Sequence, residues 1–148
     1  NINAIKLNIP LTDLGNWKEI WKFFKKQKTK NAIKRNTYYR PWGKYINLFK
    51  GKGFLLKEII INPKSSISLQ KHLYRSERWT VISGKAKITI NKNFFFKKPN
   101  ESTFIPKGSI HRVENLYNVP VQIVEAQIGA PLKESDIIRY KDIYGRVK

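Results

Sequence analysis

Two kinds of hydrophobic pattern divide the chain. Between about residues 10 and 30, lysines surround four large apolar residues at helical spacing: Trp17, Ile20, Trp21 and Phe24. This pattern predicts an amphipathic helix, and Thr12 or Asp13 could cap its start. The segment from Lys26 to Asn36 is polar and basic, which is typical of a linker.

From Tyr39 onward the pattern takes the period of strands. Turn-forming residues such as Asn62-Pro63 and Ser83-Gly84 separate short apolar runs. The predicted strands are Phe54–Ile61, Trp79–Ile82, Ala86–Ile90, Phe94–Phe96, Ser102–Ile105 and Val119–Ile128. Short strands at such intervals indicate an antiparallel sandwich or barrel. The segment from Glu134 to Tyr144 fits either a short helix or an extended tail.

Length and composition favour one folded domain. A chain of 148 residues with 41% apolar residues supports one hydrophobic core but not two domains of ordinary size. We therefore expect a helix and linker over residues 1–36 and one β domain over 37–148. The absence of cysteine excludes disulfides and thiolate metal sites. No signal-peptide pattern or membrane-spanning run is visible, so we expect a cytoplasmic protein without a membrane partner.

The net charge of +20 comes from 30 basic and 10 acidic residues. Most of the cations are lysines scattered along the chain, with the densest cluster between Lys22 and Lys34. Specific nucleic-acid binding would instead favour clustering on one element. We interpret the charge as a solvated basic surface and expect no specific nucleic-acid partner, although a positive field can also concentrate small anions.

The chain has two histidines, and neighbouring polar residues suggest that they share a site. Gln70 and His72 are two residues apart on a predicted strand and therefore project to the same face. Glu77 follows a turn at the start of the next strand, and His111 follows a turn at Pro106-Lys107-Gly108. Either histidine alone fits a hydrogen-bonded core or surface residue. Together, two imidazoles, a carboxylate and an amide oxygen suit one divalent zinc, manganese, iron, cobalt or nickel ion.

The order Gln-x-His, Glu, Pro-x-Gly-x-x-His resembles the two sequence motifs of cupins, with glutamine in place of the usual first histidine. Residues 40–146 further resemble the type II mannose-6-phosphate isomerase family, which also forms the C-terminal part of bifunctional mannose-1-phosphate guanylyltransferase/mannose-6-phosphate isomerase enzymes. The stretches that carry this resemblance include Arg40-Pro41-Trp42-Gly43, Leu69-Gln70-x-His72, Arg75-x-Glu77-x-Trp79, Asn100-Glu101-Ser102-Thr103, His111-Arg112-x-Glu114-Asn115 and Tyr144-Gly145-Arg146. The resemblance implies an all-β cupin fold, a double-stranded β-helix or jelly-roll barrel, with an N-terminal helix.

The N-terminal segment carries a second resemblance. Ile9 to Trp21 is similar to the closing segment of the sugar-phosphate nucleotidyltransferase half, in which the aspartate matching Asp13 helps to bind the catalytic metal. The glycine-rich nucleotide-binding start of that domain is absent from this chain. We therefore interpret the segment as a remnant that packs its Trp17/Trp21 face on the barrel, and we do not expect nucleotidyl transfer.

The resemblance implies a metal-dependent isomerase that interconverts mannose 6-phosphate and fructose 6-phosphate, in the synthesis of GDP-mannose and polysaccharide precursors. The reaction moves a proton between C1 and C2 of the open-chain hexose 6-phosphate through an enediol. A divalent metal would stabilise the developing oxyanion, and a base would move the proton. Four residues are candidates for the remaining catalytic roles: Lys57, Arg75, Glu125 and Arg146.

The sequence position of each candidate suggests its role. Lys57 interrupts an apolar strand, so it faces either a polar cavity or the surface. Arg75, in the loop between the ligand-bearing strands, and Arg146 are candidates to bind the phosphate through their guanidinium groups. Glu125 alternates within an apolar strand and is expected to point inward with a raised pKa. The identity of the base stays open.

Two departures from the family pattern leave a second function open. Tyr74 and Arg78 stand where relatives commonly carry histidine, and a charge at Arg78 beside the site could weaken activity. The alternative is a non-catalytic cupin module that binds a sugar phosphate or dimerises. In the run Phe94–Phe96, alternation must turn at least one ring outward, which a homodimer contact or the N-terminal helix could cover.

Overall fold

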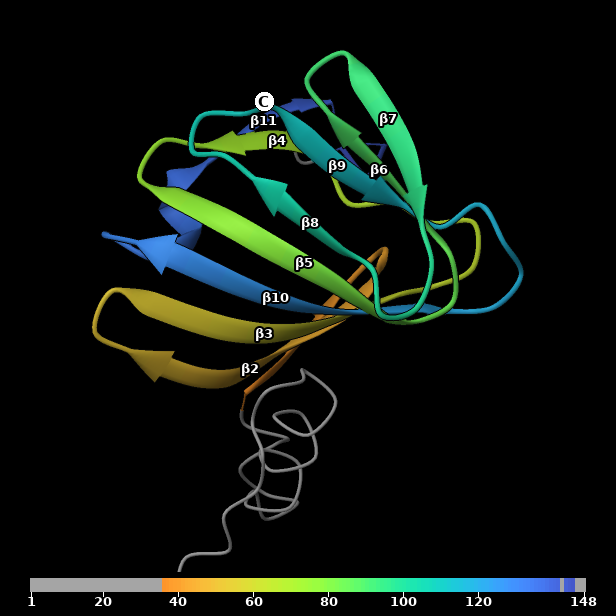
Figure 1. The fold of residues 1–148 in the computed structure, drawn as a ribbon, viewed down its shortest axis with the longest axis horizontal. Coiled ribbons are helices and arrows are strands. Elements are labelled where there is room, and N and C mark those ends of the chain that lie inside the picture. Colours follow the sequence, from red (N-terminus) through yellow and green to blue (C-terminus); the bar gives the residue numbers. More distant parts are fainter. Residues whose placement is uncertain (1–35, 142, 146–148) are drawn as a thin grey trace, which may run out of the picture.

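The alternating segments pair into two antiparallel sheets that face each other (Figure 1). The computed structural model describes residues 36–141 and 143–145. The first sheet has the order β1 (Thr37–Arg40), β2 (Gly43–Gly51), β3 (Phe54–Ile61), β10 (Val121–Gly129), β5 (Arg75–Ser83) and β8 (Ser102–Ile105). The second has the order β11 (Ile137–Lys141), β4 (Leu69–His72), β9 (His111–Glu114), β6 (Ala86–Ile90) and β7 (Asn93–Lys97). The predicted all-β class is confirmed.

The apolar pattern located three strands to the residue. The predicted Phe54–Ile61, Ala86–Ile90 and Ser102–Ile105 are confirmed as β3, β6 and β8 with the same bounds. The predicted Trp79–Ile82 was too short, because β5 begins at Arg75. Polar residues at the start of β5 point inward, so the hydrophobic pattern could not reveal them.

The C-terminal segment combines the two structures that its sequence allowed. A single 3-10 turn covers Glu134–Asp136, and β11 follows it directly as an edge strand paired with β4. The predicted helix over residues 10–30 and the candidates Asp13 and Arg146 lie outside the described residues. Within those residues, no helix is long and apolar enough to span a membrane.

One end of the interior between the sheets is a conventional apolar core. Alternate residues of each strand point inward, and seven of them are completely buried: Ile61, Val81, Ala86, Ile88, Val113, Val121 and Ile123. Paired residues face the same side of a sheet, so Ile59, Ile123 and Val81 form one apolar row across β3, β10 and β5.

Gly129 is the last residue of β10, at the end of the first sheet opposite the apolar core. It pairs with Arg75 and has a φ of +147°. A Cβ at this position would lie only 2.2 Å from the carbonyl oxygen of Tyr74. A residue without a side chain therefore allows β10 to lie close to the turn before β5. The polar residues of β5 follow this turn directly.

The aromatic run in β7 follows the expected alternation. Phe94 and Phe96 are exposed, whereas Phe95 packs against the core. The prediction that at least one ring points outward is thus confirmed, and a homodimer through these rings stays a prediction.

Candidate metal centre

The polar end of the interior continues the same rows of paired residues. Two residues further along each strand from Ile59 and Ile123, the inward-facing row across β3, β10 and β5 consists of Lys57, Glu125 and Trp79. The following row contains Gln127 of β10 and Glu77 of β5. All five of these side chains are buried. The strands thus carry a cluster of ionisable groups into the interior, where each of them requires a partner.

Three predicted ligands meet at this end. His72, Glu77 and His111 are all buried, and their potential ligand atoms lie within 4.8 Å of one another. The Nε2 atom of His72 lies 3.1 Å from Glu77 Oε1, and Nε2 of His111 lies 3.5 Å from Glu77 Oε2. The two imidazole rings are 5.0 Å apart between centroids. Residues from β4, β5 and β9 therefore converge as the spacing of the motifs predicted.

The environment of His111 fits a metal ligand. Its Nδ1 lies 2.9 Å from the carbonyl oxygen of Ser109, to which the protonated nitrogen donates. This tautomer leaves a lone pair on Nε2, which is buried without a hydrogen-bond partner among the described residues. A backbone carbonyl that orients the far nitrogen is the usual partner of a metal-bound imidazole. The donor set of two imidazoles and a carboxylate therefore fits a divalent cation.

Gln70, the fourth predicted ligand, lies beside this triad. It pairs directly with His111 across β4 and β9, so the two side chains share a face. Gln70 and Glu77 line the same small cavity. The Oε1 atom of Gln70 accepts a hydrogen bond of 2.8 Å from Ser68 Oγ. Coordination by its amide oxygen stays a prediction.

Glu77 is the anionic centre of the cluster. Burial alone would raise the pKa of its carboxyl, but contacts with His111 and His72 lower that pKa well below its usual value. Trp79 Nε1 donates to Oε2 at 3.1 Å, and Gln127 Nε2 donates to Oε1 at 3.1 Å. The carboxylate therefore stays ionised and oriented in an almost fully enclosed place.

Arg75 lies elsewhere than the sequence suggested. We expected it in the loop between the ligand-bearing strands, but it is the first residue of β5 and only 3% exposed. Its Nε donates to Glu77 Oε1 at 3.2 Å, and one terminal nitrogen lies 3.3 Å from Nε2 of His72. The guanidinium thus contacts two of the candidate metal ligands.

Asp136 holds Arg75 in this place, and the sequence did not indicate it. Its Oδ2 lies 3.3 Å from a terminal nitrogen of Arg75, and its Oδ1 accepts the backbone N–H of Leu73 at 3.0 Å. The same arginine nitrogen donates to the carbonyl of Lys133. The segment before β11 is therefore linked, through Arg75, to the candidate metal ligands. Only the register of β11 against β4 brings it there.

Lys57 and Glu125 form a second ionisable pair next to the triad. Their Nζ and Oε1 atoms are 3.9 Å apart, and Lys57 Nζ also lies 3.1 Å from Glu134 Oε1. Burial raises the pKa of Glu125 to about 7, and the charge of Glu77 adds to this effect. Burial opposes the charge on Lys57, but Glu125 and Glu134 outweigh it and raise the lysine pKa. Glu125 therefore points inward as predicted, and its burial is the cause of the raised pKa.

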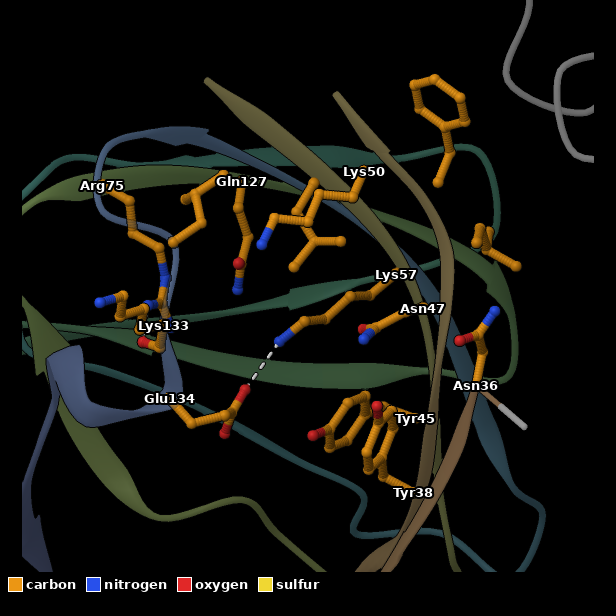
Figure 2. Close-up of a pocket in the computed structure, with 14 residues that line it drawn as sticks. Asn36, Tyr38, Tyr45, Asn47, Lys50, Lys57, Arg75, Gln127, Lys133 and Glu134 are labelled. Carbon is orange, nitrogen blue, oxygen red and sulfur yellow. Dashed lines mark hydrogen bonds and ion pairs between the residues drawn. The ribbon is translucent and has the colours of Figure 1, made fainter. Parts of the chain in front are cut away.

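Two cavities open beside this pair. The larger has a volume of about 460 Å³, and Figure 2 shows Lys57 reaching across it to Glu134, with Lys50 and Gln127 nearby. The smaller cavity has about 60 Å³ and is lined by Glu77, Gln70 and Glu125. Lys57 and Glu134 line both cavities, so their ion pair lies between the metal centre and the larger space. The prediction that Lys57 faces a polar cavity, one of two alternatives, agrees with this arrangement.

The two departures from the family pattern point away from the site. Arg78 lies on the outer face of β5, with its guanidinium 5.5 Å from the ring centroid of Phe104. Tyr74 is 49% exposed at the turn before β5. The expectation that Arg78 places a charge beside the metal ligands was wrong, because neighbouring residues of a strand face opposite sides of the sheet.

Comparison with known families places these residues in a wider group. A family model described as "Mannose-6-phosphate isomerase C-terminal" matches residues 26–142. The chain is 45% identical over 108 residues to the alginate biosynthesis protein AlgA of Pseudomonas putida, covering 73% of this chain and 22% of the relative. It is 38% identical over 129 residues to the xanthan biosynthesis protein XanB of Xanthomonas campestris, covering 87% and 28%.

A further relative carries the name of an enzyme. The mannose-1-phosphate guanylyltransferase of Escherichia coli is 40% identical over 109 residues, which cover 74% of this chain and 23% of that protein. The chain thus spans between a fifth and a third of the length of these curated relatives.

Solved structures agree on the fold. The capsular polysaccharide assembling protein CapF of Staphylococcus aureus matches with a TM-score of 0.64 at 17% identity, covering 72% of this chain and 34% of CapF. The cupin domain of Cnp3 from Schizosaccharomyces pombe matches with a TM-score of 0.55 at 18% identity, covering 58% and 60%. At such low identity these likenesses show the fold alone, and they confirm the predicted cupin class.

Proposed function

Because the chain belongs to the mannose-6-phosphate isomerase C-terminal family, as its motifs predicted, we propose that it is a metal-dependent isomerase of mannose 6-phosphate and fructose 6-phosphate. The observation that carries the proposal is the buried triad of His72, Glu77 and His111, with an unpartnered imidazole nitrogen at its centre. In this proposal the reaction supplies polysaccharide precursors, which the names of relatives in alginate and xanthan biosynthesis support.

The proposed ligands are Gln70, His72, Glu77 and His111. The mixed nitrogen and oxygen set accepts zinc, manganese, iron, cobalt or nickel. A divalent cation held by these residues would supply Lewis-acid stabilisation of the negative charge that develops on the substrate. Arg75 keeps the Glu77 carboxylate oriented, and Trp79 donates a second hydrogen bond to it.

Glu125 is the proposed base. Isomerisation removes a proton from one carbon and returns it to the neighbouring carbon, so one carboxylate beside both carbons suffices. Glu125 lines the small cavity together with Glu77, and Trp79 and Gln127 hold its two oxygens at 2.9 Å and 2.7 Å. A carboxyl pKa of about 7 lets the group accept and release a proton near neutral pH. Lys57 then supplies positive charge beside this carboxylate.

The test combines metal analysis with an isomerase assay. The purified chain should bind one equivalent of a divalent cation and convert mannose 6-phosphate to fructose 6-phosphate, and chelation should remove this activity. Replacing His72, Glu77, His111 or Gln70 by alanine should abolish metal-dependent turnover. Glu114→Gln is the matched control, because Glu114 lies on the outer side of β9 and pairs with Lys87 and Arg112.

Two results would contradict the proposal. Full activity in metal-stripped ligand variants would exclude a catalytic role for the cation. Bound metal and bound sugar phosphate without any isomerisation would instead support the alternative, a non-catalytic module. The homodimer is a separate proposal, which the molar mass in solution tests.

A further inference from the structure

Two arginines at the small cavity have no carboxylate partner among the described residues. Arg40, the last residue of β1, donates to the Tyr39 carbonyl at 2.9 Å and to the Tyr45 hydroxyl at 3.2 Å. Arg139, in β11, has a buried Nε without a hydrogen-bond partner. Both line the cavity that contains Glu77 and Gln70. Their positive charge therefore faces the cavity beside the candidate metal ligands.

The other cations of this cavity are already paired. Lys57 contacts Glu125 and Glu134, and the donors of Arg75 reach Glu77, Asp136, the Lys133 carbonyl and His72. An anionic ligand would have to break these buried ion pairs to bind either one, at considerable cost. Arg75 is thus poorly placed for the phosphate role suggested by its sequence position.

The register of the second sheet fixes where Arg139 lies relative to the metal ligands. Arg139 pairs with Gln70, and Gln70 pairs with His111. The three side chains therefore share one face across three neighbouring strands. Two inter-strand spacings separate β11 from β9, which is about 10 Å. A ligand that reaches from His111 to Arg139 must have its charged group several bonds away from its reacting atoms.

Arg40 approaches the same cavity from the other sheet. Its strand is the edge of the six-stranded sheet, whereas Arg139 belongs to the edge strand of the five-stranded sheet. The Arg40 guanidinium carbon lies 5.2 Å from the Tyr45 ring centroid, which supports its position over the cavity wall. Burial raises the pKa of Glu134, but the positive charges of Lys57, Arg75 and Arg40 together lower it below its usual value. The two arginines thus come from opposite walls.

We infer that Arg40 and Arg139 bind the phosphate of a hexose 6-phosphate whose C1 and C2 atoms lie at the triad of His72, Glu77 and His111. The inference rests on the proposed function, because it takes the reacting end of the sugar to be at the metal centre. Planar guanidinium groups match the tetrahedral phosphate through paired hydrogen bonds. In the open-chain sugar, the carbon backbone separates this phosphate from the reacting carbons, as the spacing between β11 and β9 requires.

The test measures binding rather than turnover. Mannose 6-phosphate, mannose and inorganic phosphate are titrated into the full chain, with and without added divalent metal, by calorimetry. Arg40→Gln and Arg139→Gln should each weaken mannose 6-phosphate binding by about tenfold or more, and should leave mannose binding unchanged. Arg139→Lys should recover part of the loss, since it keeps the charge but not the planar fork. Arg78→Gln, on the outer face of β5, removes the same charge and should stay within twofold of the wild type.

Several outcomes overturn the inference. Folded Arg40 and Arg139 variants that both bind mannose 6-phosphate as tightly as the wild type would exclude the site, and thermal melting checks that they are folded. Equal affinity of the wild type for mannose and mannose 6-phosphate would exclude it as well.

The two proposals can fail separately. If the arginine variants lose phosphate-dependent binding and the wild type never isomerises the sugar, the phosphate site is supported and the isomerase is contradicted. A wild type that isomerises, with variants whose KM is unchanged, contradicts the phosphate site alone.

Discussion

The interior between the sheets has an apolar end and a polar end that the same strands build. Along β10, Val121 and Ile123 point into the apolar end, and Glu125 and Gln127 point into the polar end. The same change occurs along β3, where Ile61 and Ile59 are followed inward by Lys57. The pairing of β10 with β3 is regular over both ends, and its pairing with β5 has one register shift, between Gln122 and Ile123 in the apolar end. The difference therefore lies in the side chains that the sequence places at every second position.

Trp79 forms the boundary between the two ends. Its ring belongs to the apolar cluster, and its edge meets His111 with ring centroids 5.5 Å apart. Its Nε1 donates to both Glu77 and Glu125. An apolar body with one polar handle suits such a position. The apolar end therefore stabilises the fold, whereas the polar end costs stability because its buried charges require partners.

The largest effect is expected for Glu77→Ala. Its carboxylate faces two imidazoles, a guanidinium, an indole N–H and an amide, so its removal leaves Arg75 as a buried, partly unpaired charge. The free energy of unfolding should fall by about 3–5 kcal/mol, and divalent metal binding should be lost. Urea denaturation and metal titration measure the two effects. An intact metal affinity would contradict the proposed ligand set.

Ile123→Ala should separate stability from metal binding. Ile123 is fully buried at the apolar end, so truncation leaves a cavity and costs about 2–5 kcal/mol of unfolding free energy. Metal affinity should change less than about twofold at temperatures where the variant is folded. A parallel loss of metal affinity would show that the two ends are not energetically separate.

The pH dependence of stability should report Glu125. In the unfolded chain this carboxyl releases its proton near pH 4.5, whereas burial raises its pKa to about 7 in the folded protein. Between these values the folded state holds a proton that the unfolded state has lost, so unfolding free energy falls as the pH rises. The stability of the metal-free wild type relative to Glu125→Gln should therefore drop by roughly 3 kcal/mol between pH 4.5 and pH 7. A difference that stays constant over this range would exclude the buried proton.

Asp136→Asn should weaken metal binding without unfolding the protein. The amide keeps an oxygen for the Leu73 N–H but loses the negative charge that holds Arg75. Because Arg75 orients Glu77 and His72, metal affinity should fall about 10- to 100-fold. Ser135→Ala, at the exposed neighbouring position, is the control. Equal metal affinity in both variants would show that Asp136 supports only the chain segment around it.

The smallest effect is expected for Lys87→Gln on the outer surface. Its Nζ lies 3.1 Å from Glu114 Oε2, and the side chain is 25% exposed. Such an ion pair contributes about 1 kcal/mol or less and weakens with salt. Melting curves at low and high salt measure it. A loss comparable to that of Ile123→Ala would contradict the view that the charged surface is mainly solvated.

Most of the fold was predictable because the apolar residues alternate. The bounds of β3, β6 and β8 followed directly from alternation and turn residues. The first half of β5 and all of β9 were harder to recognise, because the inward positions there hold Arg75, Glu77 and His111 rather than apolar residues. The residues that obscured these strands are those that form the candidate site.

The sequence by itself determined the all-β class, the family and the convergence of His72, Glu77 and His111, because alternation, turns and motif spacing are local properties of the chain. Only the tertiary structure decided the partners of these residues. Asp136 and Arg139 reach the centre through the register of β11 against β4, which depends on contacts between residues more than 60 positions apart. Side-chain direction also decided that Arg75 points inward and Arg78 outward, since neighbouring residues on a strand face opposite sides of the sheet.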